Sequence, residues 1–245
     1  MADAGASATI DEGFSKLRFL VANPATLSNM AYKQFREHLL LGGLLPGQQF
    51  TIRSVSSVLG VSPTPVRDAL SRLVAEGALV GTPRYYAVPD LTLAQIDEIY
   101  RIRLALEPTL AARAVGYCRP DDIRELREIQ TKLTESSNNA DYKATLRHNK
   151  AFHFKIYNLA GMEITFSLVE SLWVRNGPSL NLLYPEFGKS RQGVKNHGDM
   201  VSALEHGDAK GLEDAVVRDL ESALKSISGT MGHLDKCVGA ARLGP

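Results

Sequence analysis

The sequence predicts a mainly α-helical protein, with one small β-hairpin in its N-terminal part and a six-helix bundle after it. Three observations predict this fold class. Apolar residues recur at the 3.6-residue period of a helix along most of the chain. Two β-prone stretches flank Thr82-Pro83-Arg84, whereas no alternating strand pattern follows residue 92. With 245 residues, the chain is long enough to form two separate hydrophobic cores.

Three helices are expected in the N-terminal part. Residues 29–41 have apolar side chains at helical spacing, and two glycines follow them. Thr51 is a suitable cap for a second helix, which Gly60 would end. A third helix is expected from Thr64 to Glu76, with Pro65 in its first turn. The stretches "LVG" and "YYAV" that follow it then predict the hairpin.

The rest of the chain is expected to be helical. Breakers such as Arg119-Pro120 and Gly207-Asp208 separate its apolar-periodic stretches. The six expected helices run at about 92–117, 120–136, 140–160, 163–182, 188–206 and 208–229. We therefore expect four segments: a flexible tail (1–26), a first domain (27–90), a helical domain (91–230) and a second flexible tail (231–245).

Composition and charge exclude several classes of protein. Hydrophobic residues make up 44% and charged residues 22% of the chain, as in ordinary globular proteins. No apolar run approaches the roughly 18 residues that span a bilayer, and the first 26 residues lack the pattern of a secretory signal. Cys118 and Cys237 are too far apart for a disulfide framework or a metal motif. We therefore expect a cytoplasmic protein.

The N-terminal part has the charge that a DNA-facing domain needs. The whole chain carries a net charge of only +1, but residues 27–88 hold six Lys or Arg and three Asp or Glu. A helix, a short glycine-containing turn and a second helix are also typical of a helix-turn-helix. Arg67 on the second helix could bind a phosphate or the edge of a guanine. The alternative is an ordinary surface helix whose arginines face solvent.

The stretch "GGLLPGQQFTIRSVSSVLGVSPTPVRDALSRLVAEGALV" resembles the winged helix-turn-helix of GntR-family bacterial transcription regulators. The resemblance implies that Arg53, Ser62, Thr64 and Arg67 contact DNA, with the hairpin as a wing along the minor groove. Arg84 at the hairpin tip, like Arg53, could hold the DNA backbone. Two positions depart from the family pattern. Proline stands at position 63, where the family often has a base-reading arginine, and Tyr85 stands where a glycine is usual.

Four polar residues in the helical part are candidates for a metal site. Asn149 and His153 share one face of a helix because they are four residues apart. His197 and Asp219 lie on otherwise apolar helix faces, where buried polar groups need partners. If the four converge, two imidazoles, a carboxylate and an amide oxygen suit Zn, Mn, Ni or Fe. The alternative is a metal-free polar pocket, in which these side chains bind one another or a ligand directly.

Three further stretches resemble the FCD ligand-binding domain of the FadR subfamily: "IYRIRLALEPTLAARAV", "HNKAFHFKIYNLAG" and "NHGDMVSALEHGDAKGLEDAVVRDLESAL". The resemblance implies a small carboxylate effector and, in many members, a divalent metal held by one Asp and three His. Here Asn149 stands at the usual Asp position and Asp219 at a usual His position. The resemblance also implies that Arg103 binds the effector's carboxylate. The alternative for Arg103 is a surface salt bridge with Glu107.

We therefore expect a homodimeric, ligand-responsive transcription regulator, acting as a repressor on palindromic operator DNA. A divalent metal, Zn, Ni or Mn, would help to hold the effector. A second function stays open from the residues alone. His153, His197 and Asp219 could instead form the 2-His-1-carboxylate site of a metal-dependent enzyme.

Overall fold

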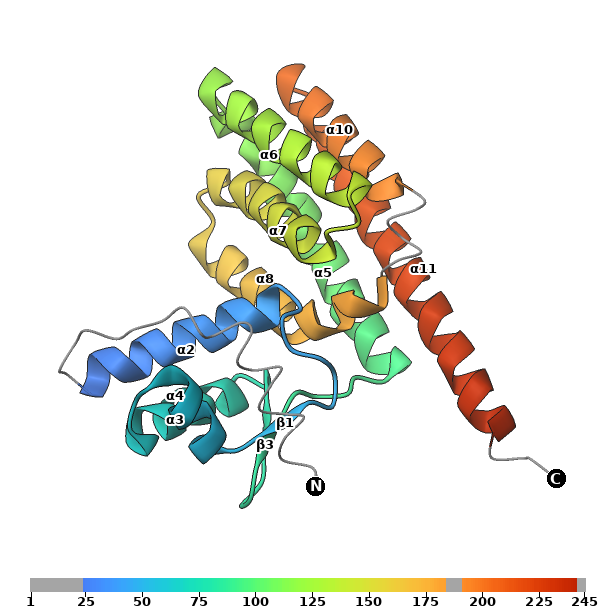
Figure 1. The fold of residues 1–245 in the computed structure, drawn as a ribbon. Helices are drawn as coiled ribbons and strands as arrows, with labels where there is room; N and C mark the ends of the chain where they lie inside the picture. Colours follow the sequence, from blue (N-terminus) through green and yellow to red (C-terminus); the bar gives the residue numbers. More distant parts are fainter. Residues whose placement is uncertain (1–23, 184–190, 242–245) are drawn as a thin grey trace. The chain divides into compact units, whose positions relative to one another are not determined.

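The computed structural model describes residues 24–183 and 191–241, and these fall into two compact units (Figure 1). The first unit contains the described residues up to Leu91 together with residues 173–178. The second contains residues 92–172 and the described residues from Ser179 onward. The expected N-terminal tail, residues 1–26, lies mostly outside the described residues.

The first unit contains three helices and a small three-stranded sheet (Figure 1). Its elements, in chain order, are α2 (Pro24–Leu40), β1 (Gln49–Phe50), α3 (Ile52–Leu59), α4 (Pro63–Ala75), β2 (Val80–Gly81) and β3 (Tyr86–Ala87). The fold class predicted from the sequence is therefore confirmed for this part of the chain. The helix α2 begins before the expected residue 29, and α4 lies one residue earlier than expected.

Local sequence explains the bend between α3 and α4. The side chains of Thr51 and Ser54 cap α3 reciprocally: the Ser54 N–H donates to Thr51 Oγ1 over 3.1 Å, and the Thr51 N–H donates to Ser54 Oγ over 3.0 Å. Gly60 ends the helix with φ at +66°, in the left-handed region that favours glycine. The chain can therefore turn within three residues and start α4 at Pro63.

The hairpin strands β2 and β3 are antiparallel, as expected, but a third strand joins them. The sheet order is β1-β3-β2, with Phe50 opposite Tyr86 and Gly81 opposite the same tyrosine. The strand β1 is an addition to the hairpin predicted from the sequence. It is only two residues long, so it has no alternating pattern that could have indicated it.

The second unit is a bundle of long helices (Figure 1). Its helices are α5 (Leu93–Ala114), α6 (Pro120–Asn138), α7 (Tyr142–Leu159), α8 (Glu163–Asn176, of which 173–176 belong to the first unit), α10 (Gln192–Glu205) and α11 (Ala209–Ala241), with 3₁₀ turns at Val115–Tyr117 and Gly177–Leu183. The helix α11 packs against α5 and α10, while α7 packs against α5 and α6. The all-α bundle predicted from the sequence is confirmed.

Two helix ends of the second unit differ most from the expectation. The helix expected at 163–182 stops at Asn176 and continues as 3₁₀ turns, because Gly177 and Pro178 interrupt it. The last helix was expected to end near 229, before a tail from 231, but α11 runs on to Ala241. Gly229 and Gly232 lower helix propensity without ending the helix. No described helix is long and apolar enough to cross a membrane.

Candidate functional site

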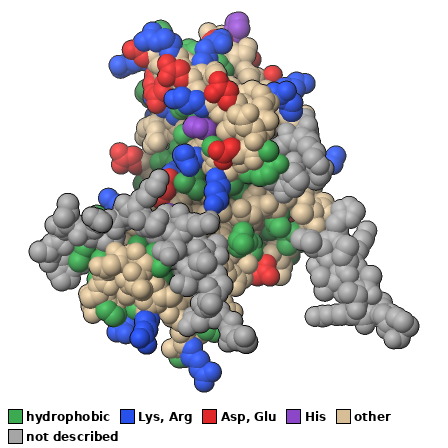
Figure 2. Space-filling view, in the orientation of Figure 1, with side chains coloured by type: hydrophobic (Ala, Val, Ile, Leu, Met, Phe, Trp, Pro, Cys, Tyr) green, Lys and Arg blue, Asp and Glu red, His purple; other side chains and the backbone are tan. Residues whose placement is uncertain are grey.

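The exposed face of α4 carries the residues that the sequence indicated for DNA. Val66, Ala69 and Leu70 are fully buried against the first unit's core, so the opposite face is turned to solvent. Thr64 and Arg67 lie on that exposed face. Figure 2 shows Lys and Arg side chains along the lower edge of this unit, below the place of α3, α4 and the hairpin in Figure 1.

The start of α4 leaves hydrogen-bonding groups available. Ser62 is the N-cap residue, but its side chain makes no capping hydrogen bond. Its exposed hydroxyl can therefore bind another group. Pro63 and Pro65 lack an N–H, so within residues 63–65 Thr64 alone offers both an N–H and a hydroxyl.

The other two predicted DNA contacts are also exposed. Arg53 lies in the first turn of α3, and Arg84 lies at the tip of the hairpin. The tip is closed by Thr82, whose N–H donates to the Tyr85 carbonyl over 2.8 Å and whose hydroxyl accepts from the Tyr85 N–H at 3.0 Å. The half-buried Tyr85 therefore belongs to a tight turn, and this turn presents Arg84 to solvent.

Three helices of the second unit bring His153, His197 and Asp219 together. They come from α7, α10 and α11, and their ligand atoms all lie within 4.8 Å of one another. His153 Nε2 is 3.1 Å from His197 Nε2 and 3.3 Å from Asp219 Oδ2. Both rings are buried and the carboxylate is nearly so. Phe152 stacks on the His197 ring at 4.3 Å between centroids.

Hydrogen bonds fix the orientation of both imidazoles. His153 Nδ1 is 3.1 Å from the Tyr157 hydroxyl, which donates to Glu107 Oε2 over 2.7 Å. His197 Nδ1 is 3.2 Å from Gln130 Oε1, and the amide nitrogen of the same glutamine donates to the Val194 carbonyl over 2.8 Å. The Nδ1 atom of each ring therefore faces an acceptor, and both Nε2 atoms point into the cluster.

Electrostatics keep His197 neutral and Asp219 ionised. Burial lowers the pKa of His197 to about 3, and His153 adds to this shift while Asp219 opposes it. Burial alone would raise the pKa of Asp219, but the neighbouring His153 and His197 rings and the hydrogen bond from Asn196 together lower it. Asn196 donates to Asp219 Oδ1 over 3.2 Å. A neutral imidazole and a carboxylate are the forms that bind metal ions.

The donor set fits a divalent metal ion. When both rings are neutral, two Nε2 lone pairs and a carboxylate oxygen converge on one point and repel one another unless a cation or a proton lies between them. Such an N₂O set suits Zn, Ni or Mn, and each histidine's outer hydrogen bond holds its ring in the binding orientation. Asn149 lies half-buried one turn before His153 on α7. Its place as a fourth ligand stays a prediction.

Arg103 and Glu107 form a buried ion pair, not the surface salt bridge considered as an alternative. Arg103 is 4% exposed, its Nε donates to Glu107 Oε1 over 2.6 Å, and its guanidinium lies 4.8 Å from the centroid of the Tyr100 ring. Burial opposes the charged form, but Glu107 outweighs it and raises the pKa of Arg103. Because Tyr157 joins Glu107 to His153, the ion pair and the triad belong to one buried polar network.

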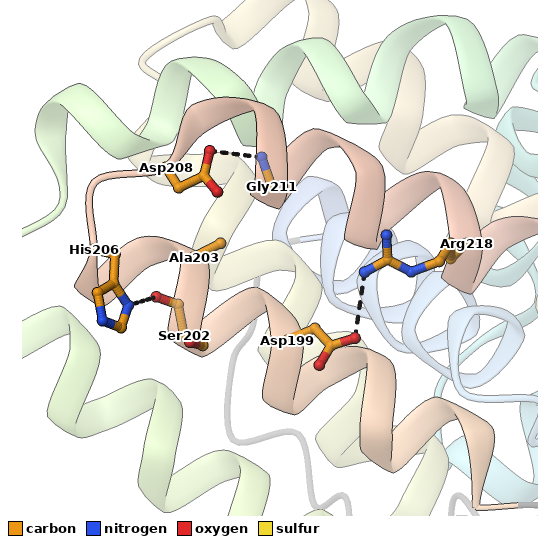
Figure 3. A pocket seen from close by; sticks show the side chains of 7 residues that line it. All are labelled: Asp199, Ser202, Ala203, His206, Asp208, Gly211 and Arg218. Carbon is orange, nitrogen blue, oxygen red and sulfur yellow. Dashed lines mark hydrogen bonds and ion pairs between the residues drawn. The ribbon is translucent and has the colours of Figure 1, made fainter.

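A separate pocket lies at the corner between α10 and α11 (Figure 3). Its volume is about 270 Å³, and Arg218 and Asp199 face each other across it at 3.3 Å. His206 bonds to the Ser202 carbonyl in its wall. None of the residues that line this pocket is a predicted site residue.

Family comparisons match both parts of the chain. Residues 27–84 match the family described as bacterial regulatory proteins of the gntR family, and residues 98–222 match the FCD domain. The chain belongs to the GntR family. It combines an N-terminal GntR helix-turn-helix with a C-terminal FCD domain, as in the FadR subfamily. It is therefore a DNA-binding transcription regulator and not an enzyme, which excludes the metal-dependent enzyme considered as an alternative.

Individual relatives support this assignment. The Escherichia coli K12 regulator McbR is 34% identical over 199 residues, which are 80% of this chain and 90% of McbR. The solved structure of E. coli McbR/YncC has a TM-score of 0.78 at 31% identity and covers 88% of this chain and 100% of its own. A regulator structure from Rhodococcus sp. RHA1 shares the fold, with a TM-score of 0.69 at 19% identity, over 83% of this chain and 98% of its own.

Sequence reasoning missed the residues that orient the triad. Tyr157 could have been found, because it lies four residues after His153 and so shares its helix face. Gln130 on α6 contacts the His197 ring on α10, and Asn196 on α10 contacts the Asp219 carboxylate on α11. Their spacing in the sequence carries no signal, since the contact depends on how the helices pack.

Proposed function

We propose that this regulator is a homodimeric repressor that binds palindromic operator DNA and responds to a small carboxylate effector held, with a divalent metal, in its helical domain. The observation that carries the proposal is the exposed polar face of α4 behind the tight turn at Gly60. The relative RspR of E. coli K12, 22% identical over 204 residues covering 82% of this chain and 89% of RspR, is described as a transcriptional repressor. This supports repression as the direction of regulation.

The DNA contacts are assigned by residue type. Arg67 lies one turn into α4, where it can reach a base edge or a phosphate in the major groove. Ser62 and Thr64 supply hydroxyls to the backbone, while Arg53 and Arg84 bind phosphates on either side. Proline at position 63 removes a basic contact that the family often has. The remaining charged contacts therefore carry a larger share of the binding free energy.

The helical domain would hold the metal through His153, His197 and Asp219, with Asn149 as the fourth ligand. The metal, Zn, Ni or Mn, would supply a Lewis-acid site for the carboxylate of the effector. Arg103 would bind the same ligand by its guanidinium, and Glu107 would hold that guanidinium in place.

Regulation then follows from two states of the dimer. A repressor releases its operator when the effector binds the DNA-incompetent state about 10² to 10⁴ times more tightly than the competent one. In this proposal residues 27–90 bind DNA, residues 91–230 bind effector and form the dimer, and the protein acts in the cytoplasm. Arg103 senses the effector, and α4 reads the operator.

DNA binding is tested first. Operator sequences are selected from random duplexes with the full-length protein, and affinity is measured by gel retardation. We expect Arg67→Ala to lower affinity at least tenfold. Arg124→Ala is the matched control, because it removes an exposed arginine from α6 and should leave affinity unchanged. Full retention of binding by Arg67→Ala would refute the assigned interface.

Metal binding is tested separately, by titrating metal-free protein with Zn²⁺. We expect His153→Ala and Asp219→Ala each to abolish binding at the site. The control is His206→Ala, which removes an exposed histidine from the end of α10. If all three variants bind Zn²⁺ as the wild type does, the triad is not the metal site.

A further inference from the structure

Tyr157 lies between Glu107 and His153. In the proposed function, Glu107 holds the effector-binding Arg103, whereas His153 binds the metal. Tyr157 is fully buried on α7, one turn after His153. Its hydroxyl donates to Glu107 Oε2 over 2.7 Å and lies 3.1 Å from His153 Nδ1. Glu107 is in turn bound to Arg103 over 2.6 Å. One phenolic oxygen therefore connects the Arg103–Glu107 pair to the metal triad.

The number of hydrogens on this oxygen decides which nitrogen of His153 is protonated. A phenol has one hydrogen, and a carboxylate paired with an arginine can only accept. The Tyr157 hydrogen must therefore point to Glu107. The phenolic oxygen then faces His153 Nδ1 with a lone pair, so Nδ1 must carry the hydrogen of that bond. In a neutral imidazole, this leaves Nε2 bare.

We propose that Tyr157 is the positioning residue that holds the proton of neutral His153 on Nδ1, so that Nε2 presents its lone pair to the metal. This inference rests on the proposed metal site. Tyr157 also links the Arg103–Glu107 pair to the triad. The direction of the Tyr157 hydrogen bond depends on Glu107, and this direction sets which nitrogen of His153 is protonated. Tyr157 touches neither the metal nor the effector in this arrangement.

Removing the hydroxyl reverses the preference of the ring. Without Tyr157 Oη, Nδ1 loses this hydrogen bond, whereas Nε2 still faces the Asp219 carboxylate at 3.3 Å. The proton of neutral His153 therefore moves to Nε2, where it hydrogen-bonds to Asp219. Metal must then displace this proton before it can bind. His197 is held by Gln130 and not by Tyr157, so its tautomer should stay the same.

The experiment uses full-length metal-free protein labelled with ¹⁵N-histidine, at pH 8. NMR assigns the tautomer of each buried ring in the wild type and in Tyr157→Phe. We expect His153 to be protonated at Nδ1 in the wild type and at Nε2 in the variant. Competition titration with Zn²⁺ should show at least about tenfold weaker binding by the variant, the usual effect of losing such an outer partner. Tyr100→Phe, which removes another buried hydroxyl near Arg103, is the matched control and should change neither reading.

The outcomes separate this inference from the metal proposal. If wild-type His153 is protonated at Nε2, the inference is overturned, whether or not the variant folds. It is also overturned if Tyr157→Phe binds Zn²⁺ more weakly without a change of tautomer, because that indicates a merely structural role. If the tautomer changes as expected but the wild type binds no Zn²⁺, the role of Tyr157 holds and the metal proposal fails.

Discussion

Arg67 and Arg72 lie five residues apart on α4, but their guanidinium groups have different surroundings. Arg67 is exposed, as a DNA contact must be. Arg72 Nη1 donates to Asn29 Oδ1 over 2.7 Å, and its guanidinium lies 3.8 Å from the centroid of the Tyr32 ring on α2. The Tyr32 hydroxyl donates to Glu76 over 2.6 Å. Arg72 thus joins α4 to α2.

Because of this difference, we expect Arg72→Ala to affect mainly stability and Arg67→Ala to affect mainly DNA binding. Arg72→Ala should lower the free energy of unfolding by about 1 kcal/mol, because it removes an exposed cation–π contact and a hydrogen bond. It should weaken operator binding less than Arg67→Ala does. Urea unfolding and gel retardation measure the two effects. If Arg67→Ala destabilises the protein as much as Arg72→Ala, the assignment of the two arginines is wrong.

At the residue scale, the sequence could predict the ligands of the candidate site better than their partners. His197 and Asp219 were predicted because each is a polar residue on an otherwise apolar helix face, and His153 because it shares a helix face with Asn149. Burial of the Arg103–Glu107 pair was not predicted, since an i, i+4 pair has the same spacing on an exposed helix as on a buried one. The assembly of these groups into one network depends on the packing of α5, α7, α10 and α11.

At the scale of elements, the α3–α4 turn depends on one backbone conformation. Gly60 has φ at +66°, and a Cβ added there would meet no atom within 4 Å. The cost of a side chain is therefore that of the left-handed backbone alone, about 1–2 kcal/mol for alanine. We expect Gly60→Ala to lower the free energy of unfolding by this amount in urea denaturation. Gly60→Asn should cost less, because asparagine tolerates this conformation. Equal stability of Gly60→Ala and wild type would contradict the argument.

A second element-scale prediction concerns the contact between α6 and α7. Lys155 Nζ is 2.8 Å from Asp122 Oδ1, and the Arg119 N–H donates to the same carboxylate over 3.0 Å. The hydrogen bond from Lys155 and this backbone N–H lower the pKa of Asp122 below its usual value. A lowered folded-state pKa means that the stabilisation is present above the unfolded pKa of about 4 and is lost as pH falls through the folded value.

Asp122→Asn should therefore destabilise the protein at pH 7, by about 1 kcal/mol or less because the pair is partly exposed. Asparagine can still cap α6, so the change tests the charge and not the cap. The difference between variant and wild type should shrink near pH 2.5, as measured by urea unfolding at both values. A difference that grows at low pH would contradict the sign of the shift.

Element boundaries show where sequence patterns stop being informative. The ends of α3 were predicted because Thr51 and Gly60 act through local geometry. The strand β1 was missed because two residues cannot show a period, and its pairing with β3 is a contact across about 36 residues. The extension of α11 to Ala241 was missed because glycines and alanines permit a helix as well as a tail.

At the scale of the whole molecule, the charge distribution agrees with DNA binding by the N-terminal part of the chain. Residues 27–88 carry a net charge of +3 while the chain as a whole carries +1, so the remainder is slightly acidic. A modest positive charge on one domain favours DNA without making the protein bind every polyanion tightly. In the proposed dimer, contacts repeated in the second subunit supply most of the specificity.

The proposed dimer leads to a test that needs no effector. Two identical winged domains read a palindrome only if both half-sites face the same side of the duplex, and one helical turn is about 10 base pairs. Inserting about five base pairs between the half-sites of a selected operator turns them to opposite faces. We expect this insertion to lower affinity at least tenfold, to the level of a single half-site, because one domain alone makes few contacts. Gel retardation measures the affinities, and sedimentation measures the mass of the complex. A monomer that binds the single half-site as tightly as the palindrome would show that α4 and the hairpin are sufficient alone, and the proposal of a dimeric repressor would have to be abandoned.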